Sequence, residues 1–122
     1  MKYSISKEDR YANIQPAEEN LTAAFAPALK TEFVLLVNGG HDNIICDLSK
    51  VNYVDSSGLS AFLVGDRICN EKNGKFVLCN ISSSIEKLLK MSQLDSILNV
   101  VPTLSEAKDL VLLHQLERDL RD

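Results

Sequence analysis

Two adjacent serines, Ser56 and Ser57, are the residues whose type and spacing best suit chemistry. They lie in the stretch Asp55-Ser56-Ser57-Gly58, which separates two apolar runs between Val51 and Val64. Asp and Ser are preferred at the N-cap of a helix, and a helical pattern follows the motif, so a helix cap is its simplest interpretation. A cap needs only one side-chain oxygen, so one of the two hydroxyls stays free to react.

The free hydroxyl is predicted to be that of Ser57. If Ser56 caps the helix, Ser57 takes the first helical position and its side chain points outward. A phosphate on Ser57 would then meet uncommitted first-turn amides and the positive end of the helix dipole. It would add about −1.5 to −2 charges to the surface and leave the fold intact. These properties suit a surface switch.

Catalytic sites have weaker support in the sequence. The chain has no Gly-x-Ser-x-Gly elbow, no phosphate-binding loop, and no histidine near Ser57 to serve as a base. Asp47 ends a predicted strand, as the phosphoacceptor of a receiver domain does. A receiver site also needs an acidic cluster after the first strand, and Glu8-Asp9 is instead typical of a hairpin turn. We therefore expect no catalytic residues.

Metal and cofactor sites are not expected either. The cysteine count is odd, no Cys-x-x-Cys pair occurs, and only His41 of the two histidines lies near a cysteine, five residues before Cys46. Cysteines within apolar runs behave as small hydrophobic residues. We expect Cys46, Cys69 and Cys79 to be buried thiols.

Length and composition indicate one globular domain over residues 1–122. Hydrophobic residues make up 45% of the chain and charged residues 25%, as is usual for such domains. The net charge is −4 and no basic cluster occurs, which argues against nucleic-acid binding. The longest clean apolar run, Phe33 to Val37, is far shorter than the ~20 residues that span a bilayer. With no signal peptide recognised, a cytoplasmic location without membrane contact is expected.

Predicted strands alternate with predicted helices along the chain. The elements expected in order are a hairpin or two short strands before residue 16, a helix over 17–37, a strand with an extended stretch over 43–54, a helix over 59–72, a strand over 75–81, a helix from about 83, a strand over 97–101 and a helix from about 103. This order predicts an α/β fold with a mixed, mostly parallel sheet of four to five strands and about four helices.

Several local details accompany this prediction. Pro27 is expected to kink or divide the first helix. Ser83 with Glu86 and Thr103 with Glu106 have the spacing of capping boxes. In the last helix, leucines form a broad apolar surface, for which core packing is the favoured interpretation and a self-association or partner surface the alternative. These leucines are Leu112, Leu113, Leu116 and Leu120.

Residues 43–110 resemble the STAS domain family, most closely the bacterial anti-sigma factor antagonists. The resemblance is carried by IICDLSKVNYVDSSGLSAFL, in which a strand ends in Asp-Leu-Ser and Asp-Ser-Ser-Gly-Leu follows after a short gap. The later stretch IEKLLKMSQLDSILNVVPTLSEA is similar to the family's third helix, fifth strand and the start of its last helix.

This resemblance implies partner switching. An unmodified antagonist binds an anti-sigma factor that is also a serine kinase, and so releases a sigma factor. The kinase phosphorylates the second serine of the motif, which ends the binding, and a serine phosphatase reverses the modification. By this resemblance Ser57 is the phosphoacceptor, while Asp55, Ser56 and Gly58 shape its loop and face the kinase. Weak homodimerisation is a further expectation.

One segment departs from the family pattern. Residues Asn13 to Leu21 read NIQPAEENL, where family members usually carry a Gly-x-Leu-Asp-like turn that often belongs to the partner surface. The identity of the kinase, and the use of Ser57 as a phosphoacceptor, therefore stay open. Two alternatives remain: an unphosphorylated accessory subunit of a transport ATPase, and a small hydrolase or nucleotide-binding enzyme.

Overall fold

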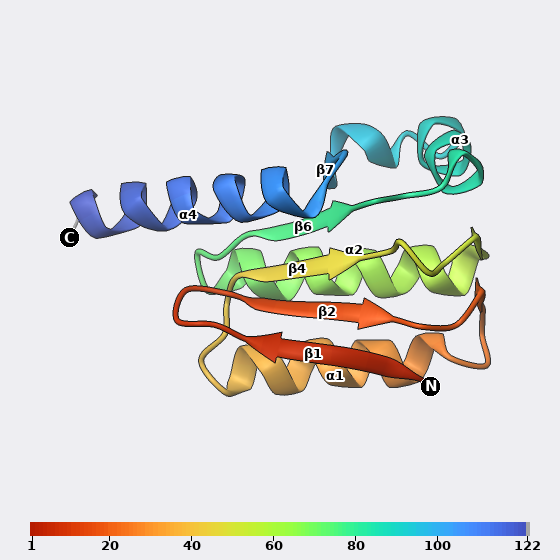
Figure 1. The fold of residues 1–122 in the computed structure, drawn as a ribbon, viewed down its shortest axis with the longest axis horizontal. Helices are drawn as coiled ribbons and strands as arrows, with labels where there is room; N and C mark the ends of the chain where they lie inside the picture. The colour runs from red at the N-terminus through yellow and green to blue at the C-terminus, as the bar shows by residue number, and fades with distance from the viewer. Residues whose placement is uncertain (122) are drawn as a thin grey trace.

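The protein has a five-stranded sheet with helices on both faces (Figure 1). The structure, a computed structural model, describes residues 1–121. The main strands are β1 (Tyr3–Lys7), β2 (Ala12–Pro16), β4 (Ile44–Asp47), β6 (Phe76–Cys79) and β7 (Asn99–Val101). The helices are α1 (Ala26–Asn38), α2 (Ser56–Glu71), α3 (Ser83–Met91) and α4 (Leu104–Arg121), with the 3-10 helix η1 (Leu94–Ser96). Two further short strands, β3 (Asn20–Leu21) and β5 (Tyr53–Val54), pair with each other.

The predicted fold class is confirmed. The sheet order is β1-β2-β4-β6-β7. The hairpin strands β1 and β2 are antiparallel, and each other neighbouring pair is parallel. Glu8 and Asp9 lie in the hairpin turn, as expected, where the Glu8 N–H donates to the Tyr11 carbonyl at 2.8 Å. The carboxyl ends of β2, β4 and β6 consequently meet at one end of the sheet.

The first helix begins later than the sequence indicated, and Pro27 does not divide it. Pro27 lies in the first turn of α1, where its missing N–H removes no hydrogen bond within the helix. Leu21, which fits the helical spacing, belongs instead to β3 and is fully buried. The chain leaves α1 through Gly40, whose φ of 97° favours glycine.

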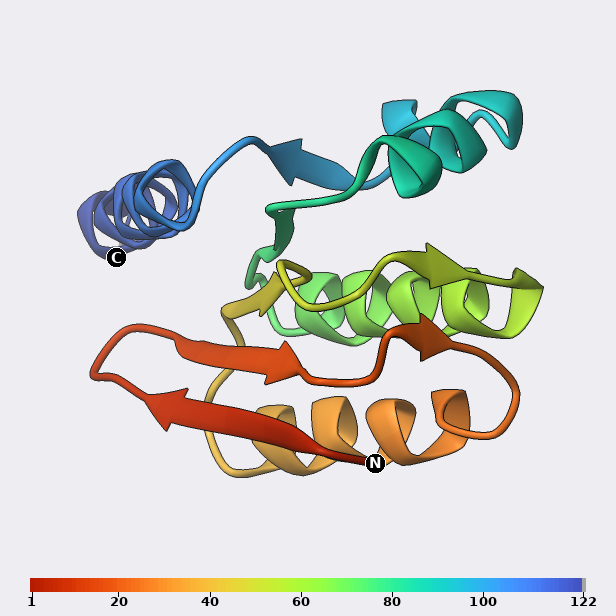
Figure 2. The same cartoon turned by 45° about the vertical axis from the view of Figure 1, so that its right-hand side comes forward.

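Apolar layers cover both faces of the sheet. Helices α1 and α2 lie side by side on one face, and α4 lies apart from them on the other (Figure 2). The Phe33 and Phe76 rings meet edge to face at 5.1 Å between centroids in the first layer. Ala107 and Val111 of α4 pack on the second face, over Val77. All three cysteines are buried and free, as predicted.

Of the two predicted capping boxes, one has a different capping residue. The N-cap of α3 is Ser82, not Ser83, because the Ser82 hydroxyl accepts the Ile85 N–H at 3.2 Å. In α4 the predicted cap is confirmed, since the Thr103 hydroxyl accepts the Glu106 N–H at 3.2 Å.

The leucines near the C-terminus do not pack in the core. Leu112, Leu113, Leu116 and Leu120 are all exposed, so core packing was the wrong interpretation. Even with this apolar surface, no helix among residues 1–121 combines the length and hydropathy needed to cross a membrane.

Candidate functional site

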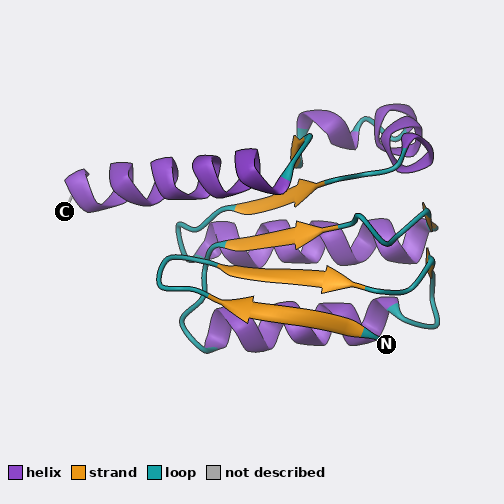
Figure 3. Cartoon of the chain, in the orientation of Figure 1, coloured by secondary structure: helices purple, strands orange, loops and turns teal. Residues whose placement is uncertain are grey.

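The Asp55–Gly58 motif lies where β5 passes into α2, at the end of the sheet reached by the parallel strands (Figure 3). In folds of this kind, ligands and partners commonly contact the carboxyl ends of the strands. The helix starts at Ser56, so Ser57 lies in its first turn, as predicted.

Asp55, not Ser56, caps α2. Its backbone is extended, with φ −100° and ψ −169°, and its Oδ1 accepts the Ser57 N–H at 2.8 Å and the Gly58 N–H at 3.0 Å. One carboxylate oxygen therefore satisfies two of the otherwise unpaired first-turn amides. The expectation that Ser56 caps the helix is wrong, and Ser57 takes the second helical position rather than the first.

Both serine hydroxyls are left without a structural role by this cap. Ser56 is exposed and Ser57 is half-buried. Within residues 1–121, neither hydroxyl makes a hydrogen bond. The amides of Ser57 and Gly58 are nevertheless occupied by Asp55, so they are not the free anion site that the sequence suggested. A modifying group on Ser57 would have to compete with the Asp55 carboxylate for them.

Gly58 is required by the close approach of β3. A Cβ at this position would lie 2.6 Å from the Leu21 carbonyl oxygen and 2.9 Å from the Val54 Cβ. No side chain fits there without a shift of backbone. The glycine of the motif thus holds the start of α2 tightly against β3 and β5, which fixes where the preceding serines are presented.

The segment that departs from the family pattern lies directly beside the motif, because it contains β3. Strand β3 pairs in parallel with β5, so that Leu21 is opposite Val54. The Glu19 carbonyl accepts the Asn52 N–H at 2.8 Å, and its carboxylate accepts the Asn52 side-chain amide at 3.0 Å. Sequence reasoning missed this contact because a two-residue strand has no periodicity to detect.

Asp47 has a structural role at the same end of the sheet. Its carboxylate accepts hydrogen bonds from the Gln15 side chain at 3.2 Å, the Asn80 side chain at 3.0 Å and the Ser49 N–H at 3.0 Å. It is 5% exposed. These bonds join the ends of β2, β4 and β6, so Asp47 differs from an accessible phosphoacceptor and stabilises the platform under the motif.

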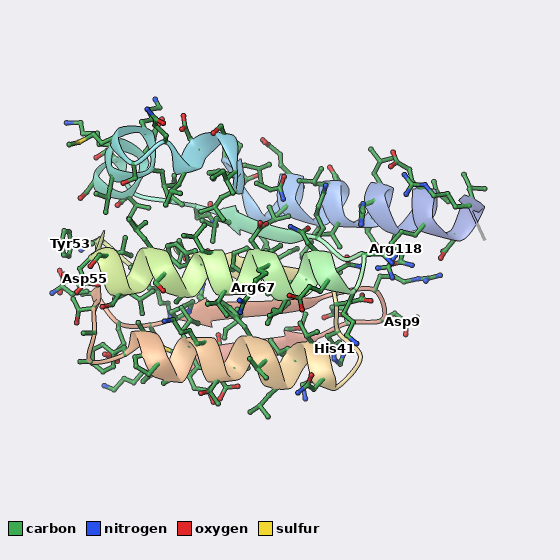
Figure 4. The ribbon with its side chains drawn as sticks, turned by 180° about the vertical axis from the view of Figure 1, so that it is seen from behind. Asp9, His41, Tyr53, Asp55, Arg67 and Arg118 are labelled. Carbon is green, nitrogen blue, oxygen red and sulfur yellow. The ribbon has the colours of Figure 1, made fainter. Side chains whose placement is uncertain are left out.

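A shallow hollow of about 330 Å³ lies between Tyr53 and α3, near the motif. Tyr53 and Asp55 lie at the same end of the molecule (Figure 4). The hollow also contains Lys87, Leu88 and the largely exposed Met91. Exposed aromatic and methionine side chains are enriched at protein-binding surfaces. No sequence pattern indicated this hollow, because its residues come together only in the folded chain.

Comparison with known proteins identifies the family. The model of the STAS domain matches residues 7–107, and the chain belongs to this family. It is 32% identical to the anti-sigma-B factor antagonist of Bacillus subtilis over 62% of this chain and 68% of that protein. It is 30% identical to the anti-sigma F factor antagonist of Paenibacillus polymyxa over 48% of this chain, and the match spans half of that relative's length.

Solved structures agree with this assignment at the level of the fold. The Bacillus cell fate determinant SpoIIAA in its phosphorylated form superposes with a TM-score of 0.69 and 21% identity, over 90% of this chain and 99% of that chain. The relatives and structural neighbours are thus anti-sigma factor antagonists.

Proposed function

We propose that this chain is an anti-sigma factor antagonist controlled by phosphorylation of Ser57. The unmodified protein binds an anti-sigma factor with serine kinase activity, and phosphate added by that kinase ends the binding until a serine phosphatase removes it. The observation that carries the proposal is the Ser57 hydroxyl, which lies without a hydrogen bond in the first turn of α2 while Asp55 does the capping. The names of the relatives support the partner class.

The binding surface of this proposal is the motif with the hollow beside it. Asp55, Ser56 and Gly58 hold and flank Ser57, and Tyr53 and Met91 supply exposed apolar area nearby. A few buried residues, often tyrosine, carry most of the binding energy of a protein interface. A partner seated on this surface would cover Ser57 and bring its own catalytic groups to the hydroxyl.

Phosphate on Ser57 changes both charge and shape at this surface. The Ser57 amide is 2.8 Å from the Asp55 carboxylate, so a phosphate on the same residue competes for that amide and repels the carboxylate. A like charge on the partner about 5 Å from the phosphate, at an effective dielectric of about 20, repels each of its added charges by roughly 3 kcal/mol. A hundredfold loss of affinity needs only about 2.7 kcal/mol. A single phosphate is therefore sufficient, even after screening by salt and water.

The test is calorimetric binding to the cognate kinase before and after incubation with ATP. Ser57→Ala should bind constitutively, and Ser57→Asp should bind weakly. Ser56→Ala is the matched control, and it should still accept phosphate and lose affinity on modification. Equal affinity of the modified and unmodified proteins would rule out the switch. Phosphate found on Ser56 would instead rule out the assignment of the acceptor.

A second candidate is an accessory subunit that binds a transport ATPase without being phosphorylated. The observation that favours it is the position of the atypical segment 13–21, which lies directly beside the motif through β3 and Glu19. Mass spectrometry of protein purified from its own cells separates the two: a phosphate-sized mass increase on Ser57 supports the switch. Turnover of an ester or nucleotide by the purified chain would support an enzyme instead.

A further inference from the structure

Helix α4 changes the kind of contact that it makes along its length. In its first half, Ala107 and Val111 are fully buried against the sheet. In its second half, the side that faces the rest of the molecule is polar. The contacting residues there are His114, Gln115, Arg118 and Asp119.

These polar contacts fasten the second half of α4 to the loop before β4, the loop before β6 and the turn between β1 and β2. Arg118 forms a two-pronged ion pair with Asp42, with nitrogen–oxygen distances of 3.3 and 3.2 Å. The Asn43 side-chain amide donates to Gln115 at 2.9 Å, and His114 lies 2.9 Å from the Asn73 carbonyl. Charge-assisted and partly buried hydrogen bonds of this kind define an orientation well. The rotation of α4 about its own axis is therefore fixed.

The outward side of this half is apolar. Leu112 is 46% exposed, Leu113 56%, Leu116 55% and Leu120 78%. A surface helix normally buries its apolar side and turns its polar side outward. Here the arrangement is reversed, and all four leucines lie beyond residue 107, where the match to the family model ends. Contiguous exposed apolar area of this kind marks an interaction site.

We propose that this leucine face pairs with the same face of a second copy of the chain, with the two α4 helices antiparallel. The leucines recur at spacings of three and four residues, which forms a continuous seam along one side of a helix. When two such seams are centred on each other in antiparallel orientation, Asp109 lies within one turn of Arg121 of the other copy. Parallel pairing would instead place Asp109 beside Asp109 and Arg121 beside Arg121.

Charge therefore favours the antiparallel arrangement. Asp109 and Arg121 are exposed, and neither is paired within residues 1–121. Two symmetric Asp109–Arg121 contacts would form in the dimer, and antiparallel helix dipoles also attract each other.

The size of the seam sets the strength of the association. Leu112 and Leu120 are eight residues apart, about 12 Å along a helix that rises 1.5 Å per residue. Stable interfaces bury about 800 Å² on each partner, more than so short a seam supplies alone. The dimer is consequently weak and in exchange with the monomer.

Asp55 and Arg118 lie at opposite ends of the molecule (Figure 4), so pairing through α4 leaves Ser57 of both copies accessible.

Sedimentation of the full chain over a dilution series tests this proposal. The average mass should rise from the monomer value of 13.5 kDa towards twice that value as concentration increases. Leu116→Glu with Leu120→Glu should raise the dissociation constant at least about tenfold, because each change replaces buried leucine area with a charge. Leu35→Glu, on α1, is the matched control, since Leu35 is 58% exposed; this variant should associate like the unchanged chain. Circular dichroism checks that each variant is folded.

A charge exchange tests the orientation. Arg121→Glu should weaken the dimer, and Arg121→Glu combined with Asp109→Arg should restore it. No response to Arg121→Glu would overturn the antiparallel arrangement. A folded monomer at every concentration would overturn the proposal and leave the leucine face to a different partner. Dissociation by Leu35→Glu would place the interface on α1 and overturn it equally.

Discussion

Asp55 caps α2 with its carboxylate. Neither serine hydroxyl is therefore needed as a cap, and both remain free. We predict that Asp55→Ala lowers the free energy of unfolding by about 1–2 kcal/mol, since two first-turn amides lose their acceptor. Ser56→Ala should change it by less than about 0.5 kcal/mol, because Ser56 is exposed and has no capping role. Urea denaturation of the two variants measures the difference. A larger loss of stability in Ser56→Ala than in Asp55→Ala would show that Ser56 is the cap.

The capping residues show what a sequence defines at the level of single residues. The presence of a cap before α2 and before α3 was predicted correctly, but the capping residue was assigned one position late in both cases. Asp, Ser and Thr are all good caps, so a run such as Asp55-Ser56-Ser57 or Ser82-Ser83-Ser84 offers several candidates. The choice depends on which residue has the extended backbone, and that is set by the strand or loop leading into the helix.

At the scale of elements, the contact between α2 and β3 depends on Gly58. We predict that Gly58→Ala destabilises the fold by about 1–3 kcal/mol, the usual cost of overpacking, because the new Cβ meets the Leu21 carbonyl oxygen at 2.6 Å. Ser60→Ala, two residues further along α2, is the control and should be close to neutral. Thermal unfolding compares the two. If Gly58→Ala is also neutral, the glycine is not required by packing, and its role in the motif must lie at the partner surface.

The long strands and helices were predictable from the sequence. The two-residue strand and the contacts between residues distant in sequence were not. Periodic apolar spacing and turn residues predicted the order of the sheet strands and helices correctly. Strand β3 was missed, and Leu21 was assigned to a helix, because two residues carry no period. In α4 the spacing of the leucines correctly indicated an apolar face but not its direction. That direction depends on Asp42, Asn43 and Asn73, which lie in loops distant in sequence.

At the scale of the whole molecule, the three cysteines report on opening of both layers of the core. Cys46 packs in the layer under α1 and α2, and Cys79 packs in the layer under α4. Burial raises the pKa of Cys69 and of Cys79 to about 12, and raises the pKa of the Cys46 thiol well above its ordinary value. Only the thiolate reacts with common thiol reagents, so in the native state all three are protected by both exclusion and ionisation.

We therefore predict that the folded chain is inert to a maleimide at a pH near 8.5, where an exposed thiol is about half ionised. All three cysteines should react together once denaturant unfolds the protein, and Gly58→Ala should speed the native-state reaction in proportion to its loss of stability. Since the folded pKa values lie above the unfolded one, stability should hold below about pH 8.5 and decline as the pH rises from there towards 12. Peptide mapping of the labelled sites follows each cysteine. One cysteine that reacts ahead of the others in the native protein would show that its part of the core opens independently of the rest.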